Sequence, residues 1–261
     1  MIKFPGLGLE FHINKSLIDF GFLKITWYAV FIVLAFVVAL LIFKKKQGRF
    51  NIKYEDILDL AIFLIPISVI GARLYFCAFN LEYYLKYPTK ILDITNGGLA
   101  IYGGIIAGAI TCFVFCKKRN INLLDLLDFV VPAIALGQAI GRWGNFTNIE
   151  AYGTVTTLPW RMGIIESGLY KEVHPTFLYE FIATLILFIL LTILQKKRKF
   201  KGEITYIYLI GYSFVRFFIE GIRADSLMLF NVRVSQILSA IIFVVFCSIL
   251  LFYVEKRKKN T

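Results

Sequence analysis

Long apolar stretches dominate this sequence and restrict the folds that it can adopt. Hydrophobic residues make up 59% of the 261-residue chain and charged residues only 18%, whereas soluble domains carry about 25% charged residues. A helix needs about 20 mostly apolar residues to cross a bilayer. The sequence therefore predicts an all-α, polytopic integral membrane protein with about seven transmembrane helices. The predicted spans are residues 25–43, 57–79, 98–116, 126–146, 176–194, 203–221 and 235–254.

Clusters of basic residues predict the orientation of the spans. Four clusters follow apolar runs, at residues 44–46, 117–119, 196–199 and 256–259. Lysine and arginine are enriched in cytoplasmic loops, so the N-terminus is predicted outside and the C-terminus in the cytoplasm. The same clustering argues against nucleic-acid binding despite a net charge of +12, because such binding needs one continuous basic surface.

The spans and their connections are expected to form one membrane-embedded domain, residues 1–261. Residues 1–24 lack the apolar core of a cleavable signal peptide, so we expect an outer amphipathic segment lying on the membrane. Residues 147–175 are expected to form an outer loop or a small head region. The four cysteines fall in apolar segments without further metal ligands nearby, which predicts buried free thiols, no metal and no cofactor.

The fourth predicted span ends in an unusual density of polar side chains. Gln138, Arg142 and Asn145 are spaced to lie on one helical face, and Glu150 and Gly153 follow in the outer loop. An arginine at the edge of the hydrocarbon costs roughly 2.5–3.5 kcal/mol on insertion scales, so it usually faces a protein interior or a substrate. A polar helix end among lipid headgroups is the alternative, but it explains only one or two such residues. The segment therefore predicts a site for an anionic ligand.

The sixth predicted span carries a second polar stripe, which consists of Tyr212, Arg216, Glu220 and Arg223. An ion pair between Arg216 and Glu220 that fixes helix packing is one interpretation. In the other, two arginines around one glutamate leave surplus positive charge, which a phosphate group would neutralise. Arginine suits phosphate because its planar guanidinium binds phosphate oxygens bidentately.

Several other residues have structural as well as functional interpretations. His174, which precedes the fifth span, is either a helix cap or a base. The Gly97-Gly98 pair after Asn96 provides either close helix packing or backbone N–H groups for an anion. Tyr28 is interpreted as an interfacial aromatic residue. Arg73, at mid-depth in the second span, requires a carboxylate or carbonyl partner that the sequence does not identify.

Five blocks of the sequence together match one pattern. The longest, residues 141–153, reads GRWGNFTNIEAYG. The others are residues 174–180 (HPTFLYE), residues 216–223 (RFFIEGIR), Trp27-Tyr28 and the double-glycine entry to the third span. In content and order these blocks resemble the bacterial phosphatidylglycerol–prolipoprotein diacylglyceryl transferase family, and they cover nearly the whole chain.

The resemblance implies an activity, partners and a location. Members of the family move the diacylglyceryl group of phosphatidylglycerol to the lipobox cysteine thiol of a prolipoprotein, which forms a thioether and releases glycerol phosphate. The implied partners are phosphatidylglycerol, the prolipoprotein signal peptide and membrane lipids. The implied location is the bacterial cytoplasmic membrane, with the active site facing the outer leaflet.

The resemblance also implies site residues, which add to the candidates named above. Arg142 and Arg216 match the family's essential arginines. Two arginines can stabilise the charge on a leaving phosphate, and a glutamate or histidine can accept the thiol proton. The predicted catalytic residues are Tyr28, Tyr102, Arg142, Glu150, His174, Arg216 and Glu220. The predicted lipid-binding residues are Gly97, Gly98, Arg142, Asn145, Gly153, Tyr212, Arg216 and Arg223.

One position departs from the family pattern. The family often has His-Gly-Gly in the third span, with a histidine proposed as a base or positioning group, whereas this chain has Tyr102-Gly103-Gly104. A phenol is a poor base at neutral pH. Either the histidine is therefore not an obligatory base, which is the interpretation we favour, or this chain uses another group.

Two alternatives to a transferase remain. A transporter or flippase for an anionic lipid or solute predicts discontinuous helices near mid-membrane in two related halves, and no internal repeat is evident. A structural membrane scaffold leaves the two intramembrane arginines Arg142 and Arg216 unexplained.

Overall fold

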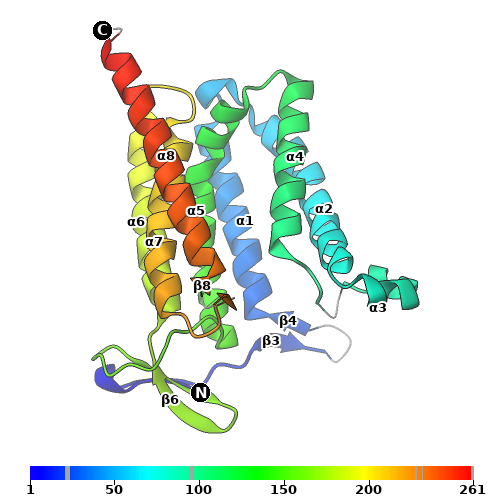
Figure 1. Ribbon diagram of the computed structural model, residues 1–261, viewed down its shortest axis with the longest axis vertical. Helices are drawn as coiled ribbons and strands as arrows, with labels where there is room; N and C mark the ends of the chain where they lie inside the picture. The colour runs from blue at the N-terminus through cyan, green and yellow to red at the C-terminus, as the bar shows by residue number, and fades with distance from the viewer. Residues whose placement is uncertain (21–23, 95–96, 227, 231, 260–261) are drawn as a thin grey trace. The chain divides into compact units, whose positions relative to one another are not determined.

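The computed structural model describes residues 1–20, 24–94, 97–226, 228–230 and 232–259, so Asn96 lies outside the described residues. Within them the chain is mostly helical, as predicted, and a long helix overlaps each of the seven predicted spans (Figure 1). These helices are α1 (Trp27–Lys46), α2 (Tyr54–Ala78), α4 (Ile101–Arg119), α5 (Leu123–Asn148), α6 (Thr176–Lys196), α7 (Glu203–Ile222) and α8 (Val234–Lys259). Six of them are long and apolar enough to cross a membrane among the described residues; α7, which contains Arg216 and Glu220, is not one of the six.

The chain packs as two compact units, and the expectation of one membrane-embedded domain stays a prediction. Unit 1 consists of Met1–Ile42 and Val130–Thr261, and unit 2 of Phe43–Phe129. Short helical segments lie between long helices, namely η2 (Arg49–Asn51), α3 (Leu81–Lys86) and η3 (Pro88–Leu92), and another, η1 (Pro5–Leu7), lies near the N-terminus. The last turns of α1 and α4 consist of basic residues, which interact favourably with the negative end of a helix dipole.

In unit 2, small residues bring α2 and α4 into close contact, as expected for a glycine-rich helix face. A Cβ atom on Gly103 would lie 2.4 Å from the carbonyl oxygen of Gly71, and one on Gly108 would lie 3.0 Å from the hydroxyl of Ser68. The backbones of the two helices can approach this closely only because side chains are absent there.

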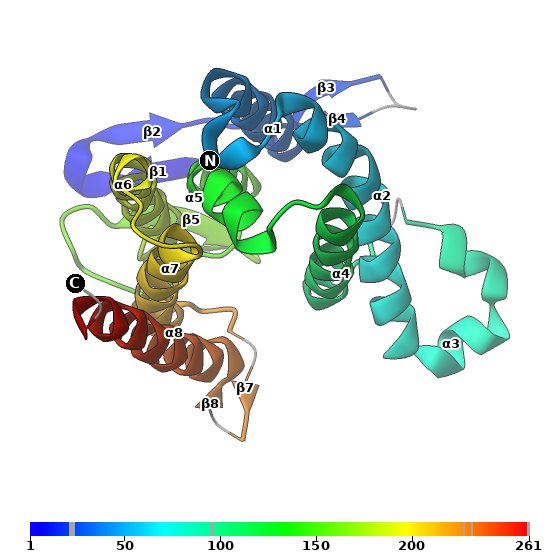
Figure 2. The ribbon, with the colours of Figure 1, turned by 90° about the horizontal axis from the view of Figure 1, so that it is seen from above.

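In unit 1, α6, α7 and α8 run side by side (Figures 1 and 2). A buried cluster joins α5, α6 and α7, and it includes Val131, Ala135, Leu187, Leu191, Ile204 and Tyr208. This packing fixes the three helices whose residues form the polar network described below.

The structure corrects the all-α prediction, because short strands are present among the described residues. A four-stranded antiparallel sheet in the order β2-β1-β5-β6 joins the N-terminus to the predicted head region. Its strands are β1 (Ile2–Phe4), β2 (Leu9–Phe11), β5 (Met162–Glu166) and β6 (Leu169–Val173). Two short hairpins pair β3 (Ser16–Asp19) with β4 (Lys24–Thr26), and β7 (Met228–Leu229) with β8 (Val232–Arg233). The described part of the N-terminal segment thus forms strands, and the expectation that residues 1–24 lie on the membrane as an amphipathic segment stays a prediction.

The four-stranded sheet is anchored to the helix ends by an apolar cluster. Phe146 of α5 and Phe177 of α6 stack with their ring centroids 4.6 Å apart, and they pack with Ile2, Phe4 and Ile164 of the sheet. The sheet therefore holds the end of α5 beside the start of α6, which is where the candidate site residues lie.

Candidate active site

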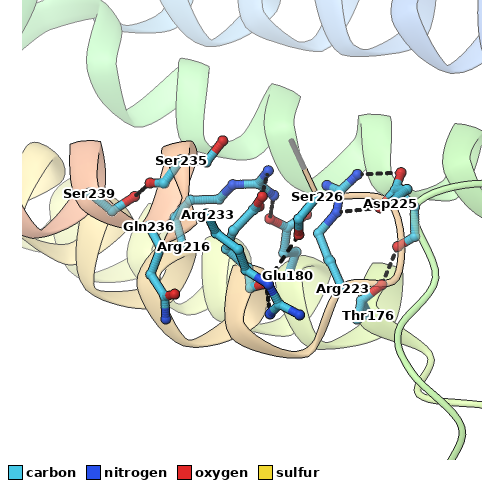
Figure 3. A network of polar contacts seen from close by, with 12 residues as sticks. Thr176, Glu180, Arg216, Arg223, Asp225, Ser226, Arg233, Ser235, Gln236 and Ser239 are labelled. Carbon is cyan, nitrogen blue, oxygen red and sulfur yellow. Dashed lines mark hydrogen bonds and ion pairs between the residues drawn. The ribbon is translucent and has the colours of Figure 1, made fainter. Parts of the chain in front are cut away.

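Three helices of unit 1 bring two arginines and two glutamates together. Arg142 Nε of α5 lies 2.6 Å from Glu180 Oε2 of α6, and Arg216 Nη1 of α7 lies 2.9 Å from Glu180 Oε1. Arg216 Nη2 also lies 2.5 Å from Glu220 Oε2, one helical turn further along α7. Figure 3 shows Glu180 and Arg216 within this network. Both glutamates are 2% exposed, so the ion pairs lie in the protein interior.

Glu180 is the functional candidate that the predicted site set omitted. With it, two carboxylates face the guanidiniums of Arg142 and Arg216, while Arg223, the second arginine expected around Glu220, pairs with Asp225. Its position in the sequence could have identified it, because Glu180 lies in an apolar span and ionisable residues in such spans usually face a partner or a substrate. The sequence could not show that α6 places it between α5 and α7.

Two ion pairs of the network leave buried atoms poorly satisfied. Arg142 Nε and Glu220 Oε2 lie close to their partners but make no hydrogen bond of good geometry with the described residues. Buried polar atoms normally have well-aligned partners. Imperfect pairing at this point leaves donor and acceptor capacity that a ligand can use.

Arg142, Asn145 and Glu150 form a chain of hydrogen bonds, which confirms that Arg142 and Asn145 share a helical face. Arg142 Nη1 donates to Asn145 Oδ1 at 3.0 Å, and Asn145 Nδ2 donates to Glu150 Oε1 at 2.8 Å. After α5 ends, Ile149 and Ala151 adopt left-handed φ values of 56° and 57°. Such values are uncommon for residues with a side chain and are often found at functional sites.

Gly153 lies where three segments of the chain converge. Its N–H donates to the carbonyl of His174 at 2.9 Å, and it pairs with Arg223 in an isolated β-bridge. A Cβ atom there would lie 2.6 Å from His174 Cβ and 3.0 Å from the carbonyl oxygen of Ile222. Only glycine allows this close approach, which fixes the loop after α5 against the start of α6 and the end of α7.

Arg223 and Arg233 surround the end of α7. Arg223 donates bidentately to Asp225, with Nε–Oδ1 and Nη2–Oδ2 distances of 2.9 and 2.8 Å (Figure 3). Partial burial alone would raise the pKa of Asp225, but the hydrogen bonds and charge of Arg223 outweigh this effect and lower it. Arg233 of β8 donates to the backbone carbonyl of Glu220. Arg223, a predicted phosphate ligand, is thus already paired with a carboxylate.

His174 takes part in a separate hydrogen-bonded group, which favours its structural interpretation. Its Nδ1 lies 3.3 Å from Tyr179 Oη, and Trp160 Nε1 donates to the same oxygen at 2.8 Å. Burial lowers the pKa of His174, so its imidazole is neutral at pH 7. Because the Trp160 N–H can only donate, the phenol proton of Tyr179 can be donated to His174 Nδ1.

The two other predicted tyrosines of unit 1 contact aromatic or glycine surfaces. The ring of Tyr28 packs against Gly144, where an added Cβ atom would lie 2.5 Å from Tyr28 Cδ2. Tyr212 stacks on Tyr208, with ring centroids 5.8 Å apart and an interplanar angle of 12°.

The remaining predicted residues, Gly97, Gly98 and Tyr102, belong to unit 2. Both glycines have positive φ values, 90° and 79°, which favour glycine. A Cβ atom on Gly98 would lie 2.2 Å from Arg73 Nη1. Tyr102 lies in the first turn of α4 and is 39% exposed.

Arg73 has the partners that the sequence left open, and they are backbone carbonyls. Its five N–H groups donate to five carbonyls over 2.6–3.0 Å. The accepting residues are Lys90, Ile91, Asp93, Gly97 and Gly98. The guanidinium also lies 5.2 Å from the ring centroid of Tyr84. Since no N–H donor remains for a ligand, Arg73 organises this loop and is not available to bind phosphate.

Among the residues that the structure describes, no group of three or more His, Cys, Asp or Glu side chains is arranged to hold a metal ion. The four cysteines are free thiols. The candidate residues described above offer guanidinium, carboxylate, amide, imidazole and phenol groups.

Comparison with known proteins identifies the family of this chain. The family model described as prolipoprotein diacylglyceryl transferase matches residues 15–253. A phosphatidylglycerol–prolipoprotein diacylglyceryl transferase of Finegoldia magna is 48% identical over 85% of this chain and 88% of its own length. Proteins of the same name from Lactococcus lactis subsp. lactis and Clostridioides difficile are 44% and 42% identical, over 98% and 91% of this chain and 98% and 94% of their own lengths. The resemblance inferred from the five sequence blocks is thus confirmed, and this chain belongs to the prolipoprotein diacylglyceryl transferase family.

Proposed function

We propose that this protein transfers the diacylglyceryl group of phosphatidylglycerol to the lipobox cysteine of prolipoproteins, the first step of lipoprotein maturation. The observation that carries the proposal is the meeting of Arg142 and Arg216, from two helices, at buried carboxylates. The names of the relatives support the same substrates, and the matches to these relatives extend over 88% and 98% of the relatives' own lengths.

In the proposed reaction, the substrate supplies the nucleophile and the protein supplies charge stabilisation. The thiol sulfur attacks a glycerol carbon, a C–S bond forms, and the C–O bond to phosphate breaks with its electron pair moving to the phosphate oxygen. Arg142 and Arg216 bind the phosphate and stabilise the charge that develops on it. Their preorganisation supports this role, since packed helices already hold both guanidiniums.

The thiol proton requires an acceptor near the phosphate. Glu150 and Glu220 are the better candidates, because Glu150 is linked to Arg142 through Asn145 and Glu220 contacts Arg216. His174 is the weaker candidate, since Nδ1 interacts with Tyr179. Tyr28, Gly153 and Tyr212 are proposed to shape the lipid site. The roles that the family resemblance implies for Gly97, Gly98 and Tyr102 stay predictions.

We also propose the membrane arrangement: seven transmembrane helices in the bacterial cytoplasmic membrane, with the N-terminus outside and the active site at the outer leaflet. The alternation of the lysine clusters supports this orientation. The span to be added to the six apolar helices is α7, the sixth in chain order. Its lower apolarity follows from the polar residues that it contributes to the network.

The test is incubation of the purified protein with phosphatidylglycerol and a lipobox peptide. Mass spectrometry should detect the thioether peptide together with released glycerol phosphate. Replacing Arg142 or Arg216 with Ala or Lys should reduce transfer by at least about 100-fold, the order of loss expected for one transition-state donor. Arg119→Lys is the matched control, because Arg119 forms a half-exposed ion pair with Asp59.

Two results would contradict the proposal. Normal transfer by Arg142→Ala would rule out the phosphate-binding role of this arginine. Movement of phosphatidylglycerol across vesicle membranes without any thioether product would instead support the transporter alternative.

A further inference from the structure

Glu180 has an unusual position for a carboxylate beside a phosphate site. One of its oxygens contacts Arg142 of α5 and the other contacts Arg216 of α7, at 2.6 and 2.9 Å. The side chain of Glu180 is only 3% exposed and contacts both guanidiniums; Figure 3 shows it beside Arg216. It therefore accepts a hydrogen bond from Arg216 and forms an ion pair with Arg142, the two arginines proposed to bind the phosphate.

A carboxylate and a phosphodiester present similar groups to arginine. Each offers two oxygens that share one negative charge, and both are bound by guanidinium in the same planar, charge-assisted geometry. The two anions cannot accept hydrogen bonds from the same N–H groups at the same time. A phosphate that binds on the side of the guanidiniums now facing Glu180 would therefore displace at least one oxygen of Glu180.

The contact with Arg142 is the weaker of the two. Arg142 Nε lies within ion-pair distance of Glu180 but does not form a well-aligned hydrogen bond, whereas Arg216 Nη1 does form one with Glu180. Arg216 also keeps Glu220 as a second partner. Displacement is thus expected to separate Glu180 from Arg142 first.

We propose that Glu180 is a positioning residue that holds the place of the substrate phosphate between Arg142 and Arg216 in the lipid-free protein. The inference rests on the proposed transferase function. Without Glu180, two like charges from different helices would repel each other across a buried space. With it, both guanidiniums remain in position, and lipid binding exchanges one anion for another.

Glu180→Gln tests the proposal because the amide keeps the shape of the side chain and removes the competing charge. The full-length protein is assayed in detergent with dihexanoyl phosphatidylglycerol and a lipobox peptide. The lipid Kd and KM should fall by about tenfold, which corresponds to about 1.4 kcal/mol. The value of kcat should also fall, because the guanidiniums are less well fixed. A purely structural role would weaken binding and lower kcat together.

Two further variants distinguish competition between the Glu180 carboxylate and the lipid phosphate from a general effect of removing a negative charge. Glu172→Gln removes a glutamate that is paired with Arg161 in the head sheet and should leave the lipid Kd unchanged. Glu220→Gln removes a partner of Arg216 only and should increase lipid affinity less than Glu180→Gln. Equal or weaker lipid binding by a folded Glu180→Gln protein, while the wild type remains active, would overturn the proposal and leave the transferase function intact.

A measurement on the wild type covers the case in which Glu180→Gln does not fold. Protein labelled with ¹³C-glutamate is examined by infrared difference spectroscopy when dihexanoyl phosphatidylglycerol is added, with dihexanoyl phosphatidylcholine as the control lipid. Loss of a guanidinium contact should shift a carboxylate stretching band with phosphatidylglycerol only. No change in the carboxylate region would overturn the proposal.

Discussion

Arg73→Lys should destabilise the loop before α4 by an amount that follows from the number of hydrogen-bond donors. Arginine provides five N–H groups here, and all five have carbonyl partners. Lysine provides three, so at least two carbonyls lose their donor. An unsatisfied buried acceptor costs about 1–3 kcal/mol. Because Lys90 and Gly97 are exposed, water can replace part of the loss, and we expect about 2–3 kcal/mol in total.

Amide hydrogen exchange measures this local effect directly. A cost of about 2–3 kcal/mol corresponds to a rise of roughly 30- to 140-fold in the population of the open loop. The exchange rate is proportional to that population when the loop closes faster than an exposed amide exchanges. The amides of Asp93 and Ala100 are suitable probes, since they donate to the carbonyls of Lys90 and Ala72. Both should exchange faster in Arg73→Lys.

Arg119→Lys in the same unit is the control for this prediction. Its exposed ion pair with Asp59 is worth at most about 1 kcal/mol, and exchange at Asp93 and Ala100 should stay within about fivefold of the wild type. Exchange rates in Arg73→Lys that match those of the control would refute the donor-count argument. They would show that the five hydrogen bonds do not hold the loop.

Two further predictions concern candidate proton-transfer groups. Tyr102→Phe should lower transfer only about 2- to 10-fold, because the hydroxyl makes no hydrogen bond with the described residues and a phenol is a poor base; complete loss would restore a proton-transfer role. Burial lowers the pKa of His174 in the folded protein. The contribution of the neutral imidazole to the free energy of unfolding is therefore present above its ordinary pKa of about 6.5 and is lost as the pH falls through the lowered pKa of the folded state. Unfolding midpoints measured from pH 7.5 to 5.5 should therefore fall less steeply in His174→Gln than in the wild type, whereas the exposed His12→Gln serves as control; identical slopes for all three proteins would contradict the assignment.

Arg73 and Arg142 illustrate the limit of reading this sequence. Both are arginines in apolar spans, and the sequence marks both as residues that need a partner. In the structure the two arginines differ in the number of guanidinium N–H groups that remain available to a ligand. Arg73 is saturated by the carbonyls of one loop, whereas Arg142 keeps a poorly aligned Nε beside Glu180. Hydrogen-bond saturation depends on distant backbone positions, which local spacing cannot reveal.

The head sheet shows a second limit. β1 and β5 lie about 160 residues apart in the chain and are three and five residues long. Strands this short give little periodicity, and a pairing between them depends on long-range contacts. The N-terminal segment was therefore expected to lie on the membrane, although Ile2 and Phe4 are buried in the cluster around Phe146.

The amino-acid sequence by itself determined the long apolar helices and the family, because these depend on apolar length and on local motif order. Spacing within the chain also placed Arg142 with Asn145, and Arg216 with Glu220, on shared helix faces, and the structure joins the members of each pair. Only the tertiary structure decided that Glu180 joins the two arginines and balances their charge. A salt bridge across three helices depends on how those helices pack, and helix packing is set by contacts among residues far apart in the chain.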